Sequence, residues 1–149
     1  MVATHVRIGP RLPDPTPTYS DVVADVREFL MARVEMARSA GIPDERIMVD
    51  AGLDLGKTPE MSASLLRCSD DLVSLGFPVF LSASNKGFLG DLTGAGIDER
   101  VEPSWSAHAL GITLGCRIIR AHDVRGGRRV ADTMAAVLAA GSVASGASS

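Results

Sequence analysis

The sequence predicts an α/β fold built from parallel strand-helix units, and three observations lead to this prediction. Four short apolar runs rich in β-branched residues each precede a stretch with helical periodicity, the alternation expected of parallel strands joined by crossover helices. Glycine and proline residues mark the ends of the periodic stretches. The 149 residues are 46% hydrophobic and 22% charged, so they are expected to form one globular unit.

The predicted strands cover residues 2–8, 46–51, 78–83 and 116–121. Four of the eight prolines lie within residues 9–17, which indicates an extended, stiff loop after the first strand. The first helix is expected to begin near Thr18, whose spacing to Asp21 suits a capping box, and to end at Gly41 and Pro43. Its expected buried stripe consists of Val22, Val26, Phe29, Leu30 and Ala37.

Three more helices are predicted from the same signals. Thr58 and Pro59 begin the second helix, which Gly76 ends, and its inward face is Met61, Leu65, Cys68, Leu72 and Leu75. The third begins at Pro103 and ends before Gly115, with Trp105, Ala109 and Ile112 on its apolar side and His108 at the edge. The last covers residues 128–140 and is expected to bury Val130, Met134, Val137 and Leu138. Residues 1–140 thus form the predicted domain, and 141–149 are a predicted disordered tail of Ser, Ala, Gly and Val.

Charge and composition exclude several classes of function. The formal net charge of −3 leaves no basic field for a nucleic-acid backbone, so DNA or RNA binding is not expected. No apolar run reaches the length of a membrane span or a signal peptide, which argues against a membrane location. Cys68 and Cys116 match neither a metal-ligand spacing nor a disulfide framework. Both are therefore expected to be reduced thiols in a cytoplasmic protein.

Four strand-helix units are half the number in a closed eightfold α/β barrel of the TIM type. Half of a barrel would have two open edges and an exposed inner sheet face, which a partner or another part of the chain must cover. We therefore expect either a missing amino-terminal half or an assembly of halves.

Polar side chains follow each of the four strands. They are His5 and Arg7; Asp50; Ser84, Asn85 and Lys86; and Arg120, His122 and Asp123. The active site of a parallel α/β fold lies at the carboxyl ends of its strands, so these residues are expected to gather at one rim. One carboxylate, several cations and imidazoles favour a pocket for an anion joined to a heterocycle, although strand ends also turn polar simply to meet water.

The glycine-punctuated segment 51–58 leads from the second strand into a helix. It contains Gly-Lys-Thr, but its spacing fits neither a P-loop nor a dinucleotide fingerprint. We favour ordinary strand-to-helix turn chemistry over a phosphate cradle.

Three motifs resemble the last three strand-end motifs of dihydropteroate synthase, in order and interval. They are Asp50-Ala-Gly-Leu-Asp-Leu-Gly-Lys57, Leu81-Ser-Ala-Ser-Asn-Lys86 and Ile119-Arg-Ala-His-Asp-Val124. The resemblance extends to Thr4-His5 and to the helix start after Tyr19. It implies a pterin-binding barrel, of which this chain supplies the carboxyl-terminal half, and a transferase of folate biosynthesis. The implied reaction condenses 6-hydroxymethyl-dihydropterin diphosphate with 4-aminobenzoate.

The resemblance also implies a role for each site residue. Asp50 would pair with the amino group and ring N–H of the pterin, and Lys86 would meet the ring acceptors and orient 4-aminobenzoate. Ser84 would lie beside that second substrate, while Arg120 and His122 would bind the departing pyrophosphate. Lys86, Arg120 and His122 are thus the expected catalytic residues. The family further implies Mg²⁺, with its ligand outside this chain, and a homodimer.

Three positions depart from the family pattern. The family has proline where this chain has Ala51, an apolar aromatic turn at Asp54-Leu55, and arginine at Asn85. Losing that arginine removes a cation that can lie on the pterin face, a contact worth about 0.5–2 kcal/mol. Asp54 is expected to add negative charge near anionic substrates.

These departures leave alternatives open. The chain is either part of a working synthase or a non-catalytic paralogue that acts as a binding or oligomerisation module. A pterin-binding methyltransferase domain is less favoured, because a methyl carrier offers no pyrophosphate for Arg120 and His122. His108 is expected to be structural and remote from the strand ends. Arg125, Arg128 and Arg129 are expected to be a solvated cluster rather than an extension of the anion site.

Overall fold

The computed structural model describes residues 1–8, 14 and 17–140, so most of the predicted loop at 9–17 and the predicted tail at 141–149 lie outside it. Within the described residues, four short strands run parallel in chain order. β1 (Val2–Thr4) pairs with β2 (Met48–Asp50), and β3 (Phe80–Leu81) pairs with β4 (Ile118–Ile119). A parallel bridge from Val49 to Val79 joins the two pairs. The predicted parallel α/β fold is confirmed, although each strand is shorter than its apolar run.

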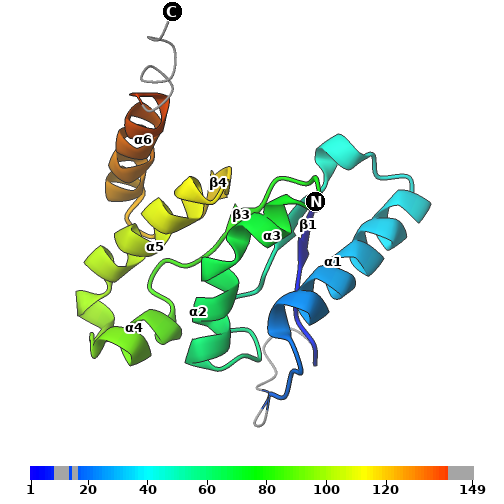
Figure 1. Cartoon of the computed structure of the whole chain (residues 1–149), viewed down its shortest axis with the longest axis horizontal. Helices are drawn as coiled ribbons and strands as arrows, with labels where there is room; N and C mark the ends of the chain where they lie inside the picture. The colour runs from blue at the N-terminus through cyan, green and yellow to red at the C-terminus, as the bar shows by residue number, and fades with distance from the viewer. Residues whose placement is uncertain (9–13, 15–16, 141–149) are drawn as a thin grey trace, which may run out of the picture.

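The helices lie beside one another in chain order. Figure 1 shows α1, α2 and α5 next to each other, with α6 projecting away at the carboxyl end. The bounds are α1 (Val22–Ser39), α2 (Pro59–Arg67), α3 (Ser69–Val73), α4 (Gly87–Thr93), α5 (Val101–Thr113) and α6 (Val124–Ala140), with short 3-10 helices at Asp44–Arg46 and Ile97–Glu99. In the described part of the chain, no helix is both long and apolar enough to span a membrane.

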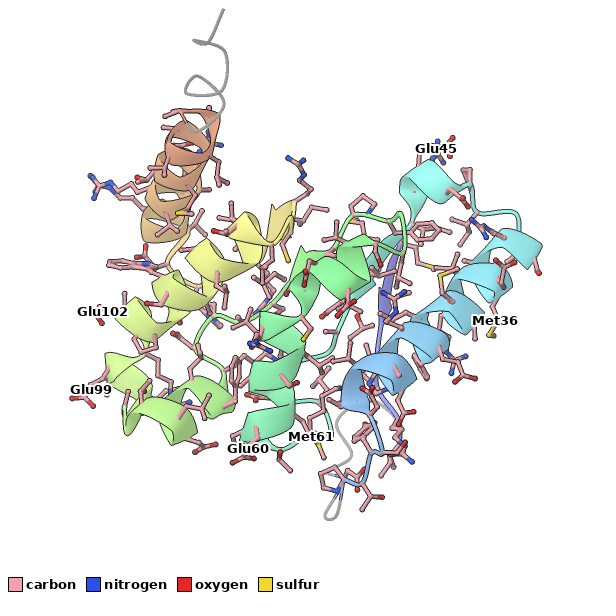
Figure 2. All side chains as sticks on the ribbon, viewed as in Figure 1. Met36, Glu45, Glu60, Met61, Glu99 and Glu102 are labelled. Atoms are coloured by element: carbon pink, nitrogen blue, oxygen red, sulfur yellow. The ribbon has the colours of Figure 1, made fainter. Side chains whose placement is uncertain are left out.

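The core is mostly aliphatic, with Phe77 and Phe88 as its buried aromatic side chains. Val26, Leu30 and Val34 on one face of α1 are fully buried, and Val49 in β2 is buried among them and the next helices. Figure 2 shows the opposite kind of position, with Met36, Glu45 and Glu102 pointing outward from their helices. Burial of one apolar stripe holds α1 against the strands.

α1 begins later than predicted, because Asp21 rather than Thr18 caps it. The Asp21 carboxylate accepts hydrogen bonds from the backbone N–H groups of Val23 and Ala24, at 2.9 and 3.1 Å. A short aspartate placed directly before the first turn satisfies these donors itself. The capping box starting at Thr18 was therefore wrong.

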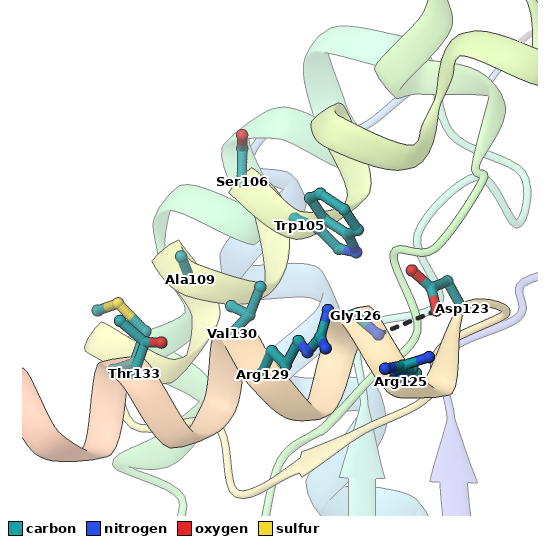
Figure 3. A pocket seen from close by; sticks show the side chains of 10 residues that line it. Trp105, Ser106, Ala109, Asp123, Arg125, Gly126, Arg129, Val130 and Thr133 are labelled. Carbon is teal, nitrogen blue, oxygen red and sulfur yellow. Dashed lines mark hydrogen bonds between the residues drawn. The ribbon is translucent and has the colours of Figure 1, made fainter.

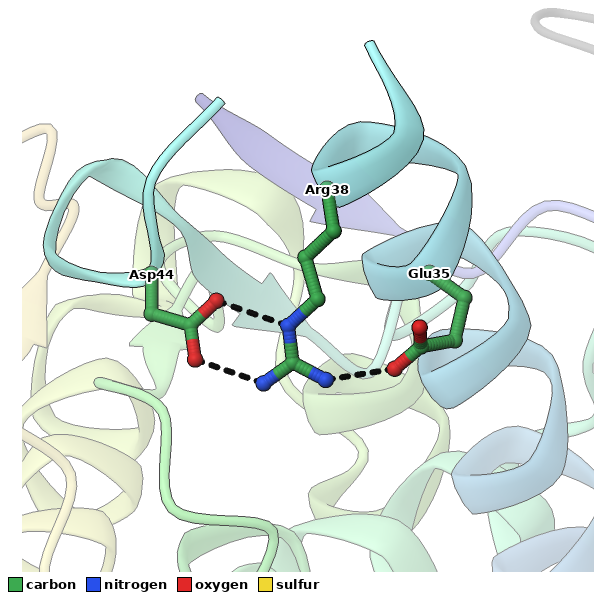
Figure 4. Close-up of polar contacts among 3 residues, drawn as sticks. All are labelled: Glu35, Arg38 and Asp44. Atoms are coloured by element: carbon green, nitrogen blue, oxygen red, sulfur yellow. Dashed lines mark hydrogen bonds and ion pairs between the residues drawn. The ribbon is translucent and has the colours of Figure 1, made fainter. Parts of the chain in front are cut away.

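The end of α1 is tied to the 3-10 helix that precedes β2. Figure 4 shows the Arg38 guanidinium between the carboxylates of Glu35 and Asp44, with 2.5 Å nitrogen-oxygen distances. These side chains are exposed, so the ion pairs add little stability. They fix the direction in which the chain enters β2.

The region after β2 contains two departures from the prediction. The predicted second helix breaks at Cys68 into α2 and α3, where the backbone leaves the helical region with φ −101° and ψ 33°. α4 was missed altogether. Its seven residues, Gly87–Thr93, include two glycines, and the group that caps its amino terminus is Asp54, far away in the sequence.

The faces of the last two helices also differ from the prediction. α5 buries Ser104, Ala107, His108 and Gly111, so His108 lies inside the packed face instead of at its edge. On α6, Val137 is 59% and Leu138 is 48% exposed, which contradicts their predicted burial. α6 contacts α5 mainly at its beginning and then projects outward, so its distal apolar residues have no surface to cover.

Candidate functional site at the strand ends

Asp50 ends β2 and is only 7% exposed. Its Oδ1 accepts a hydrogen bond from the Gly52 N–H at 2.8 Å, and its Oδ2 accepts one from the hydroxyl of Thr4 at 3.4 Å. Burial raises the pKa of Asp50 above its ordinary value, while the Gly52 bond and the charges of Lys86 and Lys57 oppose that rise. A carboxylate with two of its four lone-pair positions occupied still has room to accept from a ligand.

Lys57 is buried, and its ammonium group contacts three protein atoms. Its Nζ donates to the carbonyl oxygens of Gly52 at 2.9 Å and Leu55 at 3.0 Å, and lies 2.9 Å from Nδ1 of His5. Burial lowers the pKa of Lys57 to about 8 and that of His5 to about 4, with the Lys57 charge adding to the effect on His5. Three acceptors match the three protons of an ammonium group.

The glycine-punctuated segment is therefore a turn, as favoured. Gly52 has φ +66°, and a methyl group there would lie 2.1 Å from the carbonyl oxygen of His5, so only glycine fits. The lysine of the Gly-Lys-Thr sequence holds this turn against β1 instead of facing a phosphate. His5 was predicted as a strand-end residue, but its contact with the Lys57 ammonium group was not predicted.

Asp54 has a different role from the one expected. Its side chain accepts hydrogen bonds from the backbone N–H groups of Gly87 and, at 3.2 Å, Phe88, which are the first residues of α4. A carboxylate there offsets the partial positive charge of the helix amino terminus. Asp54 was predicted to add negative charge near the substrates, but its carboxylate caps α4 instead.

The ends of β3 and β4 are joined by Ser84 and His122. The Ser84 hydroxyl, 4% exposed, accepts a hydrogen bond from the backbone N–H of His122 and lies 3.0 Å from its Nδ1. Arg120 continues the ladder, since its N–H donates to the Leu81 carbonyl at 2.9 Å. The Arg120 and His122 side chains are both exposed and lie just after the end of β4.

Asn85 and Lys86 form the turn between β3 and α4. Asn85 has φ +55°, a left-handed conformation that asparagine tolerates better than most residues, and its N–H donates to the Ser104 hydroxyl at 2.9 Å. Lys86 is half-buried, and its Nζ donates to the Leu53 carbonyl at 3.0 Å. The positive charge of Lys86 lowers the pKa of Asp50, so the side chains that follow β2 and β3 interact electrostatically.

Not every predicted strand-end residue belongs to this cluster. The Arg7 guanidinium lies 4.6 Å from the centre of the Tyr19 ring and donates to the Thr18 carbonyl. His108, expected to be remote, lines a small cavity together with Ser84 and Asp123. Thr4 was also missed, although its pairing with Asp50 follows from the parallel register of β1 and β2.

A larger groove of about 750 Å³ runs between α5 and α6. Figure 3 shows Trp105 of α5 facing Arg129 and Val130 of α6, with Asp123 at one end. Asp50 and Lys86 do not line this groove. Arg125, Arg128 and Arg129 are exposed, and Arg128 pairs with Asp132, in agreement with a solvated cluster.

The model of the family described as "Pterin binding enzyme" matches residues 1–122. The chain belongs to this pterin-binding enzyme family. It is 39% identical over 120 residues to the inactive dihydropteroate synthase 2 of Mycobacterium leprae, covering 80% of this chain and 41% of that protein. Over 129 residues it is 34% identical to the dihydropteroate synthase of Bacillus subtilis, covering 87% of this chain and 45% of that one.

A solved structure of the same kind matches nearly the whole of this chain. It is the dihydropteroate synthase from Xanthomonas albilineans in complex with 7,8-dihydropteroate, at 35% identity and a TM-score of 0.83. The match covers 93% of this chain and 51% of that one. The chain thus has the fold of these TIM-barrel enzymes but spans about half the length of the relatives it matches.

Proposed function

We propose that this chain forms the carboxyl-terminal part of a dihydropteroate synthase site that binds a pterin diphosphate and 4-aminobenzoate. One observation carries the proposal: the three matching motifs, which contain Asp50, Lys86 and His122, lie at the carboxyl ends of the adjacent parallel strands β2, β3 and β4. The buried carboxylate, the half-buried ammonium group and the exposed Arg-His pair are different in chemistry. Together they suit a ligand with a donor-rich ring at one end and an anionic group at the other.

Asp50 and Lys86 hold the pterin in this proposal. The 2-amino group and ring N–H of a pterin are parallel donors, and a carboxylate accepts both at once in a charge-assisted pair. The bonds from Gly52 and Thr4 fix the Asp50 carboxylate before the ligand arrives. Lys86, held by the Leu53 carbonyl, supplies the donor for the ring acceptors.

Arg120 and His122 hold the pyrophosphate in this proposal. The Ser84 hydroxyl fixes the position of His122 through its contacts with the backbone N–H and Nδ1 of that residue. The reaction breaks the bond between the pterin methylene carbon and the diphosphate oxygen, and pyrophosphate leaves with the bonding electrons. The amine nitrogen of 4-aminobenzoate then attacks that carbon and loses a proton. Cationic groups that meet the growing charge on the leaving group lower the barrier most.

The resemblance implies Mg²⁺, which would neutralise charge on the diphosphate when bound. Within residues 1–8, 14 and 17–140, no group of three or more His, Cys, Asp and Glu side chains is arranged to hold a metal ion. These described residues therefore do not make up a metal site of their own.

A complementary half completes the site in this proposal, with the present chain supplying four of the eight strand-helix units. Apolar side chains line a groove of about 400 Å³ between β1 and α1, where a preceding unit would pack; they include Val2, Met36, Ala37 and Ile42. A second protomer or the rest of a longer chain would fill it. Sedimentation of the isolated chain should show self-association, and a compact, cooperatively unfolding monomer would argue against a half-barrel.

We also propose a cytoplasmic location. Cys68 and Cys116 are both free thiols, and Cys116 is buried. Free thiols persist in the reducing cytoplasm.

A non-catalytic paralogue is the second candidate, and Asn85 favours it. Its side chain replaces the arginine that the family pattern places against the pterin, and the Mycobacterium leprae relative is named as inactive. An assay with pterin diphosphate, 4-aminobenzoate and Mg²⁺ separates the two candidates. Pyrophosphate release with dihydropteroate formation, lost in Arg120→Gln, supports the synthase; pterin binding without product supports the paralogue.

A further inference from the structure

Three buried polar atoms of α5 lack a hydrogen-bond partner among the residues that the structure describes. They are Nε1 of Trp105 and both ring nitrogens of His108, a side chain only 1% exposed. Burial lowers the pKa of His108, so the ring is neutral and has one donor and one acceptor. Buried polar groups are nearly always hydrogen-bonded, so three unmatched atoms within one helical turn point to a further partner.

A small cavity of about 30 Å³ is lined by Trp105 and His108. The rest of its lining is Val101 and four polar residues from the strand ends and from α5: Ser84, Asn85, Ser104 and Asp123. One water molecule takes up roughly 30 Å³ in the liquid and needs two to four polar partners. The cavity therefore has the size and the lining for a single water and is too small for an organic ligand.

Two glycines at the start of α6 lie close to Trp105 and His108. A methyl group on Gly126 would lie 2.2 Å from Oδ2 of Asp123 and 2.6 Å from Nε1 of Trp105, so the acceptor and the donor both border that point. Figure 3 shows the indole of Trp105 on the side of α5 that faces Gly126 and Asp123. A methyl group on Gly127 would lie 3.8 Å from Nδ1 of His108. Side chains at either position would close the space between α5 and α6.

We propose that one structural water occupies this cavity and joins α5 to the end of β4. It accepts from the indole N–H of Trp105 and donates to the Asp123 carboxylate and to the acceptor nitrogen of His108, so it pairs with two of the three unmatched atoms. Asp123 also accepts from the Gly126 N–H at 2.9 Å and directly follows His122. Trp105 and His108 thus act as positioning residues for the strand end that carries His122, whether or not the chain has synthase activity.

Nuclear magnetic resonance tests the water directly, because Trp105 is the only tryptophan of the chain and gives one indole N–H signal. A long-lived buried water should give a nuclear Overhauser cross peak to this proton. The peak should persist in Ser84→Ala and in Ser104→Ala, since these variants remove hydroxyl protons that could imitate water by exchange. Absence of the peak in the native chain, or its loss in both variants, would overturn the proposal.

A pair of His108 variants tests the same water by the sign of a stability change. With the water present, His108→Leu removes one of its partners, so the urea midpoint should fall and the cross peak should disappear, while His108→Gln should retain both. If the cavity is dry, leucine relieves two unmatched nitrogens and the midpoint should rise instead. Ser106→Ala, an exposed change on the same helix, should leave the midpoint and the peak unchanged.

Discussion

The ammonium group of Lys57 lies 2.9 Å from Nδ1 of His5, in the buried space behind Asp50. This contact requires His5 to accept through Nδ1, so the imidazole is neutral and carries its proton on Nε2. β1 is thereby fixed to the turn that follows β2. The candidate site therefore lies next to a buried contact between the charged Lys57 side chain and the neutral His5 ring.

The first prediction concerns acid stability. The pKa of His5 falls from 6.5 to about 4 on folding, so the unfolded chain binds a proton before the folded one does. His5 therefore contributes stability above pH 6.5 that is lost as the pH falls toward 4. From pH 7 to 4, the free energy of unfolding should fall by up to about 3 kcal/mol more in the native chain than in His5→Gln. Equal losses in urea titrations of both proteins would exclude this role.

The second prediction concerns the stability cost of Asp50. Burial raises its pKa, so the folded chain binds a proton more readily than the unfolded one, and stability falls as pH rises above 3.8 through the raised pKa. Asp50→Asn keeps the shape and an acceptor for Gly52. The variant should have a higher urea midpoint than the native chain at pH 7, and this advantage should vanish below pH 3.8. A lower midpoint at pH 7 would mean that the carboxylate stabilises the fold.

The third prediction concerns the helix that sequence analysis missed. Asp54→Ala removes the cap of α4, and it also places alanine at a left-handed position with φ +64°. Together these changes should lower the free energy of unfolding by about 2 kcal/mol. Asp54→Asn is the matched control, because asparagine tolerates the conformation and still accepts a hydrogen bond, and it should cost less than half as much. If both variants lower the free energy of unfolding equally, the effect of Asp54 comes from its charge alone.

Local signals in the sequence were sufficient for the strands and for the motifs at their ends. Asp50 and Lys86 were predicted because each follows an apolar run, and parallel strands bring such ends together. α4 could not be predicted in this way. Its cap is Asp54, more than thirty residues earlier, and only tertiary structure reveals that contact.

The burial of His108 was missed for a related reason. Periodicity along α5 favours Trp105, Ala109 and Ile112 as the inward face. The buried face instead includes Ser104, whose hydroxyl accepts from the Asn85 N–H, and Gly111, which lies close to Leu81 of β3. These contacts with distant parts of the chain turn the His108 side of α5 inward, and the periodicity of one helix does not contain them.

The fourth prediction concerns the departure at Asn85. Asn85→Arg places arginine at φ +55°, which should cost about 1 kcal/mol of stability. It should strengthen pterin binding by roughly 1–2 kcal/mol through stacking on the ring, provided that Asp50 and Lys86 hold the ring at its edges. Asn85→Gln carries similar backbone strain without the charge, so it should not strengthen pterin binding. A gain that survives Lys86→Met would indicate nonspecific charge attraction.

The most direct test of the proposed site is calorimetry of 6-hydroxymethylpterin binding at pH 7, on this chain and on any longer form of the protein. The native protein should bind the pterin, and Asp50→Asn should weaken binding by about 2–3 kcal/mol, because an amide N–H replaces one acceptor of the charge-assisted pair. Asp123→Asn, after the end of β4, should leave pterin affinity within a factor of two. Unchanged affinity in a folded Asp50→Asn variant would contradict the account and leave Asp50 as a residue of the fold alone.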